Sequence, residues 1–193
     1  MQKHRDSNKW WQQPAPLVSS LQREWLTRGG ALTEALRQVG RLHLRVLSEK
    51  VCRFGTEEAL RLGLVPGQPA WQREVCMSLN GQDCVVAHSV TTLQASLGCW
   101  QAMKRLRNRP LADILYQDRS IIRSGFEFGR IKQGMPLAKR IQALQSVKEI
   151  TYARRSVFWR ARQPLLVVEA FLPNFWLQAR NQRAHRSLIK HLP

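Results

Sequence analysis

Residues 164–173 form an almost unbroken apolar run of strand length that one carboxylate interrupts. Successive side chains of a strand point to opposite faces of a sheet. The face of Glu169 is otherwise formed by Leu165, Val167 and Phe171, and the opposite face is apolar as well. This pattern predicts a strand covered on both sides, where a carboxylate is rare unless it is hydrogen-bonded or functional. Glu169 is therefore a candidate site residue; the alternative is a carboxylate at the strand end that reaches solvent past Pro173.

A second charged residue interrupts the apolar face of a predicted strand at residues 71–79. Arg73 shares this face with Trp71, Val75 and Met77. An inward Arg is costly unless it meets an anion, and its planar fork suits a carboxylate. Arg73 is thus a candidate for binding an anionic ligand. The alternative is an internal ion pair, for example to Glu169.

The next residues, Asn80-Gly81, are a strong signal for a two-residue hairpin turn. Residues 84–90 are then the return strand. With Asn80 and Gly81 as the two turn residues, Leu79 pairs with Gln82, and counting outward places Arg73 opposite His88. The predicted register therefore puts an imidazole beside the inward guanidinium.

The remaining pattern predicts one α+β domain. Strands are expected at residues 42–46, 71–79, 84–90, 120–130, 153–159 and 164–172, and helices at residues 20–28, 33–38, 56–63, 93–106, 111–116 and 135–145. Hairpins outnumber β-α-β alternation. This favours a mainly antiparallel sheet of about six strands with helices packed on it.

Length and composition indicate a single core. The chain has 193 residues, of which 44% are hydrophobic, long enough for one core and short for two. Residues 1–19 are interpreted as an irregular basic and polar lead-in, residues 20–176 as the domain, and residues 177–193 as a basic tail. The tail has only a thin apolar stripe and is read as a short helix or a disordered arm. We expect the domain to fold without it.

Two further properties narrow the class of protein. No apolar run reaches transmembrane length and no signal peptide is visible, so a cytoplasmic protein is expected. The four cysteines, Cys52, Cys76, Cys84 and Cys99, lack the spacing of a zinc site or a disulfide framework. We therefore expect four reduced thiols and no metal.

The chain is strongly basic, with 31 Lys and Arg against 13 acidic residues and a net charge of +18. Such a charge attracts nucleic acid, anionic lipid or anionic small molecules. The basic residues are spread along the chain, and no RNA- or DNA-binding motif spacing is present. Specific nucleic-acid binding is not expected. Peripheral attraction to membranes or polyanions and attraction of an anionic substrate both stay open.

Several segments together resemble the chorismate pyruvate-lyase family. They occur in the family's order at residues 71–74, 80–81 with 87–90, 109–111, 126–130, 153–156 and 165–173, and residues 25–33 resemble its N-terminal helix and loop. The resemblance covers roughly residues 20 to 176 and implies the family's fold. It also implies conversion of chorismate to 4-hydroxybenzoate and pyruvate, the first committed step of ubiquinone synthesis. A monomer that needs no cofactor is expected.

The resemblance also implies roles for individual residues. Arg73 would hold the ring carboxylate, helped by the backbone at Leu32 and Leu111, and Glu169 would meet the 4-hydroxyl end. His88 stands where the family commonly has Arg, so it is expected to bind substrate as a titratable cation. Arg73 and Glu169 are the expected catalytic residues.

The sequence leaves two questions open. Elimination could proceed by cyclic transfer of the C4 hydrogen to the enolpyruvyl methylene, or with Glu169 as a base. Two other functions also remain possible for this sequence. One is a non-catalytic binding module, since the fold resembles effector domains of transcription regulators. The other is a basic RNA- or membrane-associated protein whose lyase-like pocket has decayed.

Overall fold

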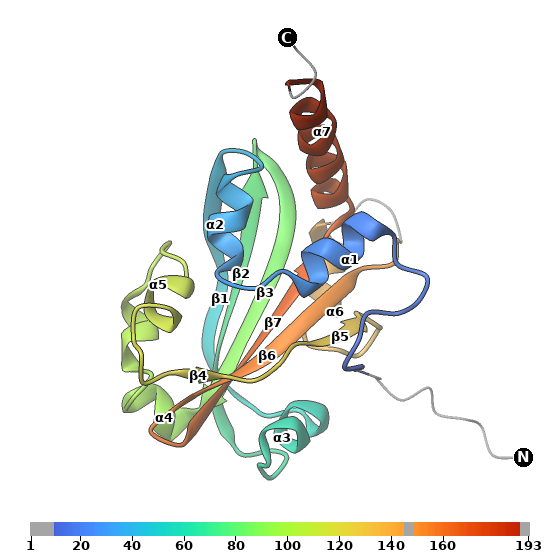
Figure 1. The fold of residues 1–193 in the computed structure, drawn as a ribbon. Coiled ribbons are helices and arrows are strands. Elements are labelled where there is room, and N and C mark those ends of the chain that lie inside the picture. Colours follow the sequence, from blue (N-terminus) through green and yellow to red (C-terminus); the bar gives the residue numbers. More distant parts are fainter. Residues whose placement is uncertain (1–9, 145–148, 190–193) are drawn as a thin grey trace, which may run out of the picture.

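The computed structural model describes residues 10–144 and 149–189 and contains an antiparallel sheet with helices on both faces (Figure 1). The sheet is formed by β1 (Leu42–Arg53), β2 (Pro69–Leu79), β3 (Gln82–Thr92), β4 (Ile122–Arg123), β5 (Glu127–Arg130), β6 (Tyr152–Arg160) and β7 (Gln163–Phe171). Its order is β1-β2-β3-β7-β6-β4, and β5 also pairs with β6. The chain's last strand therefore lies in the middle of the sheet, covered on both sides as its apolar pattern predicts.

The helices connect and cover these strands. They are α1 (Ser20–Thr27), α2 (Leu32–Arg37), α3 (Thr56–Leu62), α4 (Leu93–Leu97), the 3-10 helix η1 (Gln101–Arg105), α5 (Ala112–Leu115), α6 (Ala138–Leu144) and α7 (Pro173–Ile189). Ser19 caps α1 through a capping box with Gln22, which satisfies free N–H groups of the first turn. The expected helix over residues 93–106 is broken at Gly98, where α4 ends.

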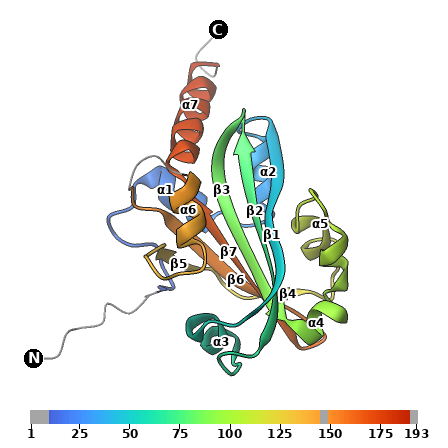
Figure 2. The same ribbon diagram turned by 180° about the vertical axis from the view of Figure 1, so that it is seen from behind.

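The two faces of the sheet have different covers. In Figure 1, α1 and α2 lie over the near face, with α4 and α5 at its side. The view from behind in Figure 2 shows α3 and α6 on the other face. Trp25 and Phe175 belong to the core of the near face, and Leu62 and Ile141 belong to the core of the far face. The near face is called the front face below, and the far face the back face.

The fold class predicted from the sequence is confirmed: a single α+β domain built on an antiparallel sheet. The sheet has seven strands and not about six. The difference arises at residues 120–130, where one expected strand is divided into β4 and β5, and both pair with β6.

The predicted register of the Arg73 hairpin is wrong. Leu79 does pair with Gln82, but the register shifts between Met77 and Ser78, so that Arg73 lies opposite Ser89. Such a bulge sets two residues of one strand against one of the other. A shift of one residue moves every later side chain to the other face. His88 consequently pairs with Glu74 and points to the back face.

Both ends of the domain extend beyond the predicted boundaries. Trp11 forms a bridge with Phe128, and Val18 is buried, so the described part of the expected lead-in belongs to the fold. At the other end, the boundary at 176/177 falls inside α7. Ala179 is buried there, and the Gln182 side chain donates to the main-chain carbonyl of Gln38 at 2.9 Å. The first part of the expected tail is therefore a packed helix.

Candidate active site

A cavity lies on the front face of the sheet, beneath α2, α5 and the β4–β5 segment. Its charged and hydroxyl side chains are Arg73, Arg123, Arg154, Glu169, Thr33, Ser89, Ser156 and Tyr116, and its apolar lining includes Leu32, Leu44, Val75, Met77, Leu111, Phe126, Phe158 and Val167. The unfilled volume is about 60 Å³. This is room for a few water-sized groups.

Arg73 forms the first end of this cavity and is 2% exposed. Its Nε lies 2.8 Å from Oε1 of Glu49, the residue opposite it on β1. Its Nη2 donates to the main-chain carbonyls of Arg107 and Arg109. Burial lowers the pKa of Arg73, and the Glu49 carboxylate opposes that shift. Among the described residues Nη1 has no hydrogen-bond partner, so it is the donor left for a ligand.

Glu169 forms the second end, and its partner is Arg154. The two residues lie opposite each other on β7 and β6, with Nε of Arg154 2.6 Å from Oε2 of Glu169. Arg154 is 1% exposed, and its Nη1 donates to the main-chain carbonyls of Trp25, Leu26 and Arg28. The ion pair therefore orients the Glu169 carboxylate and ties it to the C-terminal end of α1. The alternative pairing of Arg73 with Glu169 does not occur.

Arg154 was not among the candidate residues, although the sequence contains a signal for it. The β6–β7 hairpin turns at Ala161 and Arg162, which both have positive φ, as a two-residue I′ turn requires. Counting outward from this turn pairs Arg154 with Glu169. The same count applied to the Arg73 hairpin fails because only that hairpin contains a bulge.

Arg73 and Glu169 face the same cavity from different strands. Arg73 lies opposite Ser89, and Glu169 lies opposite Ala87 on the other side of β3. The Cα atoms of Arg73 and Glu169 are two strand spacings apart across the sheet and two residues apart along it, which corresponds to roughly 12 Å. Apolar side chains line the space between these ends. The arrangement suits a flat ring with an anionic group at one end and a hydrogen-bonding group at the other.

Leu32 and Leu111 both line the cavity, as the resemblance implies. Leu32 is the first residue of α2, and Leu111 directly precedes α5. N–H groups in the first turn of a helix have no partner within that helix. Main-chain donors are therefore expected where the resemblance needs them, whatever the side chains at the two positions.

His88 does not reach the cavity, so its predicted place beside Arg73 is wrong. Its Nε2 lies 2.8 Å from Oε1 of Glu58, and its Nδ1 lies 3.6 Å from Oε1 of Glu74. Arg140 pairs with the same Glu74 at 2.8 Å. Burial lowers the pKa of His88, but the carboxylates of Glu58 and Glu74 outweigh it and raise the pKa to about 9. His88 is thus part of a charged cluster on the back face.

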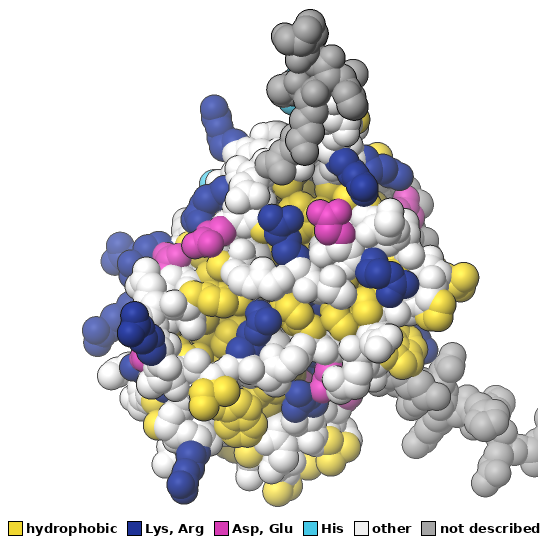
Figure 3. Space-filling view, in the orientation of Figure 1, with side chains coloured by type: hydrophobic (Ala, Val, Ile, Leu, Met, Phe, Trp, Pro, Cys, Tyr) yellow, Lys and Arg dark blue, Asp and Glu magenta, His cyan; other side chains and the backbone are white. Residues whose placement is uncertain are grey.

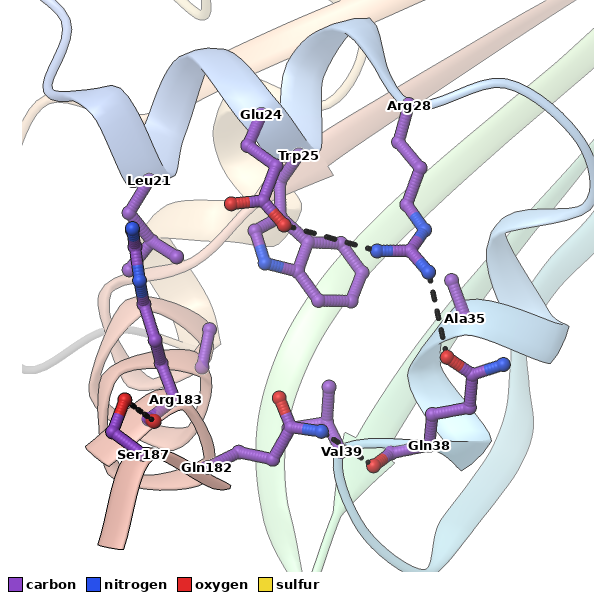
Figure 4. Close-up of a pocket in the computed structure, with 11 residues that line it drawn as sticks. Leu21, Glu24, Trp25, Arg28, Ala35, Gln38, Val39, Gln182, Arg183 and Ser187 are labelled. Carbon is purple, nitrogen blue, oxygen red and sulfur yellow. Dashed lines mark hydrogen bonds and ion pairs between the residues drawn. The ribbon is translucent and has the colours of Figure 1, made fainter. Parts of the chain in front are cut away.

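A wider hollow of about 590 Å³ lies between α1, α2 and α7 (Figure 4). Arg28 crosses it, 3.9 Å from Glu24 and 3.4 Å from the Gln38 side chain. Glu24 is exposed and Arg28 is half-buried, and more than a third of each side chain is open to solvent. Charges of this kind are solvated and need no ligand, so the front-face cavity with its buried charges is the better candidate site.

Surface charge and metal ligands single out no other site. Figure 3 shows Lys and Arg side chains spread around the face seen there, between apolar surface and a few acidic groups. Across the described ranges, no group of three or more His, Cys, Asp or Glu side chains is placed to hold a metal ion. No helix within the same ranges is long and apolar enough to cross a membrane.

The fold and the site define a single α+β domain whose antiparallel sheet carries an arginine and a paired carboxylate in one largely apolar cavity. Residues 6–181 match the family described as chorismate lyase. The chain therefore belongs to the chorismate lyase family, and the resemblance found in the sequence is confirmed.

Individual relatives agree with this assignment. A protein of Bordetella avium named "Probable chorismate pyruvate-lyase" is 47% identical over 182 residues, which cover 94% of this chain and 92% of the relative. The "Probable chorismate pyruvate-lyase 1" of Pseudomonas fluorescens is 35% identical over 181 residues, which cover 94% of this chain and 98% of the relative.

Solved structures with the same fold include domains of transcription regulators. The effector domain of PhnF from Mycobacterium smegmatis aligns with a TM-score of 0.53 at 14% identity, covering 75% of this chain and 90% of that domain. The C-terminal domain of a histidine utilization repressor from Pseudomonas syringae aligns with a TM-score of 0.52 at 19% identity, covering 69% and 92%. At such identities the likeness concerns the fold alone.

Proposed function

We propose that this protein is a chorismate lyase that converts chorismate to 4-hydroxybenzoate and pyruvate. The observation that carries the proposal is the placement of Arg73 and the Arg154–Glu169 pair at opposite ends of one apolar cavity. Family membership supports chorismate as the substrate. A cavity with an anion-binding end, an apolar middle and a hydrogen-bonding end complements the ring of both substrate and product.

The ring carboxylate binds at the Arg73 end. Nη1 of Arg73 donates to it, and the main-chain N–H groups of Leu32 and Leu111 complete the set of donors. Glu49 and the carbonyls of Arg107 and Arg109 hold the guanidinium in place, so little side-chain entropy is lost when the ligand binds. The carboxylate thereby fixes the orientation of the ring in the cavity.

The C4 end of the ring lies at Glu169. The reaction breaks the C3–O bond, and its electron pair becomes the carbonyl of pyruvate. The proton at C4 leaves its electrons to the ring, which becomes aromatic, and the enolpyruvyl methylene gains a proton to form the pyruvate methyl group. Glu169 holds the hydroxyl group at C4, which aligns the hydrogen on the C4 carbon for transfer. This hydrogen passes either directly to the methylene or through the carboxylate of Glu169.

Arg154 prepares Glu169 for this role. The guanidinium lies 2.6 Å from the carboxylate and fixes one of its two oxygens. Oε1 of Glu169 stays available for the substrate. Because Arg154 is itself held by main-chain carbonyls, the carboxylate is positioned before substrate binds, which is the condition for electrostatic preorganisation.

Incubation of the purified protein with chorismate tests the proposal. We expect 4-hydroxybenzoate and pyruvate to form in equal amounts, followed by chromatography and by a coupled assay for pyruvate. Binding of 4-hydroxybenzoate without turnover of chorismate would identify a non-catalytic binding module instead. Retention of nucleic acid with steep salt dependence, without either activity, would favour a basic polyanion-binding protein.

The same proposal includes the setting of the reaction. We place the enzyme in the cytoplasm as a monomer without a cofactor, where its product enters ubiquinone synthesis; the family resemblance supports this setting. The net charge of +18 supports attraction of the dianionic substrate and weak peripheral attraction to anionic membranes or polyanions. Specific nucleic-acid binding is not part of the proposal.

A further inference from the structure

The cavity contains a cation that the roles above leave unused. Three arginines line it: Arg73, Arg123 and Arg154. Arg73 is paired with Glu49, and Arg154 is paired with Glu169. Within the described ranges no carboxylate is paired with Arg123, whose Nη1 instead donates to the hydroxyl of Tyr116 at 3.0 Å. A half-buried guanidinium without a counter-ion favours an anionic ligand.

Arg123 is held at a defined place in the cavity. It lies on β4 opposite Phe158, whose side chain also lines the cavity. Its guanidinium carbon lies 4.2 Å from the centroid of the Phe126 ring. The hydroxyl of Tyr116, which receives its hydrogen bond, donates to the carbonyl of Gly30 at 2.7 Å. A stacking ring and a fixed acceptor thus limit the positions of this cation.

This place belongs to the Glu169 end of the cavity. The guanidinium carbon of Arg154 lies 4.4 Å from the centroid of the same Phe126 ring, so Arg123 and Arg154 share one aromatic neighbour. Arg73, in contrast, is anchored by β1 and by the carbonyls of residues 107 and 109. Each end of the cavity therefore has one arginine that can bind an anion: Arg73 at the first end and Arg123 at the Glu169 end.

We propose that Arg123 binds the carboxylate of the enolpyruvyl group, the part of the substrate that leaves as pyruvate. The inference rests on the proposed function and adds a second anion subsite to it. Chorismate carries one carboxylate on the ring and another on the enolpyruvyl ether at C3, next to the C4 carbon. With the ring carboxylate at Arg73 and C4 at Glu169, the second carboxylate reaches the end of the cavity where Arg123 lies.

The subsite distinguishes the substrate chorismate from the aromatic product 4-hydroxybenzoate. 4-Hydroxybenzoate keeps the ring carboxylate but lacks the enolpyruvyl carboxylate. Arg73 therefore contacts both molecules, whereas Arg123 contacts only chorismate and the departing pyruvate. Holding the side chain of chorismate through its carboxylate also fixes the methylene carbon that receives the proton. Arg123 is thus a substrate-binding residue that sets the choice of the dianion over the monoanion.

The test compares chorismate with 4-hydroxybenzoate in Arg123→Gln. A charge-assisted contact of this kind predicts a loss of about 10- to 100-fold in kcat/KM for chorismate. The Kd of 4-hydroxybenzoate, measured by calorimetry, should change by less than about threefold. A parallel loss of both quantities, or an unchanged kcat/KM, would overturn the subsite.

Three further variants make the result specific. Arg119→Gln removes the same charge from an exposed position in the same segment, and its kcat/KM should stay within about threefold of wild type, since exposed charges are screened. Arg123→Lys should lose less kcat/KM for chorismate than Arg123→Gln does, but chorismate should still be affected more than 4-hydroxybenzoate. The ammonium group of Lys cannot replace the planar, two-pronged guanidinium. Tyr116→Phe removes the hydroxyl that accepts from Arg123 and donates to the carbonyl of Gly30, while the Arg123 charge is kept; if it reproduces the full loss, the proposal fails.

The outcomes for the proposed function and for the subsite are separable. Turnover of chorismate by the wild-type protein tests the function alone. If the wild type does not turn chorismate over, calorimetry with chorismate and with 4-hydroxybenzoate on wild type and Arg123→Gln still tests the subsite. If Arg123→Gln does not fold, Arg123→Lys must show the selective loss for chorismate, and equal losses for both ligands would contradict the inference.

Discussion

Nε of Arg154 lies 2.6 Å from Oε2 of Glu169, and the two residues are direct neighbours across β6 and β7. The guanidinium also donates to three main-chain carbonyls at and beyond the C-terminal end of α1. One buried side chain therefore joins the candidate catalytic carboxylate to the segment that leads into α2 and covers the cavity. Stability and activity are expected to depend on it together.

Arg154→Met should lower the free energy of unfolding by about 3–5 kcal/mol, because a carboxylate and three carbonyl groups lose their donor inside the protein. Urea unfolding at neutral pH measures the change. Arg45→Met, which breaks the more exposed pair with Asp83, is the matched control and should cost at most about 1 kcal/mol. Equal costs would mean that Arg154 is not a structural anchor.

Arg73→Ala should weaken binding of both chorismate and 4-hydroxybenzoate, since both present the ring carboxylate to this residue. Removal of a charge-assisted pair costs about 2–4 kcal/mol, or roughly 30- to 1000-fold in Kd. Calorimetry with 4-hydroxybenzoate and steady-state kinetics with chorismate give the two values. The exposed Arg105, changed to Ala, is the control. Retention of full lyase activity in Arg73→Ala would remove this residue from the site.

Glu169→Gln should reduce turnover more than binding. The amide keeps an acceptor for Arg154 and the shape of the site, but it loses the charge and the capacity to take a proton. A fall in kcat of about 100-fold or more indicates that the carboxylate acts as a base. A fall below about tenfold favours cyclic transfer within the substrate. Unchanged kcat would show that the carboxylate contributes to neither route.

His88 should make stability depend on pH and leave substrate affinity unaffected. Its pKa is raised to about 9 by Glu58 and Glu74 against the cost of burial, while the unfolded value is about 6.5. The stabilisation is therefore complete below pH ~6.5 and disappears as the pH rises through about 9. Relative to His88→Gln, the wild type should lose on the order of 2–3 kcal/mol of unfolding free energy across this window.

Two measurements check the His88 prediction. Urea unfolding at several pH values should show that the stability difference between wild type and His88→Gln narrows as the pH rises. The pH profile of kcat/KM should have the same shape in both proteins, because His88 points to the back face. A profile that changes in the variant would place the imidazole in the cavity after all.

Two truncations test the role of α7. Removal of residues 184–193 takes away a segment whose described side chains are exposed, and the Tm should stay within about 2 °C of the full chain. Removal of residues 177–193 also deletes buried Ala179 and the hydrogen bonds of Gln178 and Gln182. We expect the Tm to fall by about 4–8 °C, from a loss of about 2 kcal/mol. Identical melting of both truncations would show that α7 adds nothing after Trp176.

The local patterns of the chain were sufficient to predict most elements and to single out two charged residues that line the cavity. Strand periodicity isolated Arg73 and Glu169 as charges on apolar faces, and Asn80-Gly81 marked the hairpin turn. These signals are local because side-chain direction alternates from one residue to the next along a strand. The antiparallel fold class follows from the same information, since consecutive strands joined by short turns pair with each other.

Partners across the sheet depended on the tertiary structure. The bulge beside Met77 and Ser78 has no local signal, yet it moves His88 to the back face and leaves Ser89 opposite Arg73. Whether Arg73 pairs with Glu49 or with Glu169 depends on which strands are neighbours, and β3 separates Arg73 from Glu169. Arg123 lines the cavity because β4 pairs with β6. Residue spacing along the chain predicts faces, but contacts between strands and helices distant in sequence are set by packing of the whole domain.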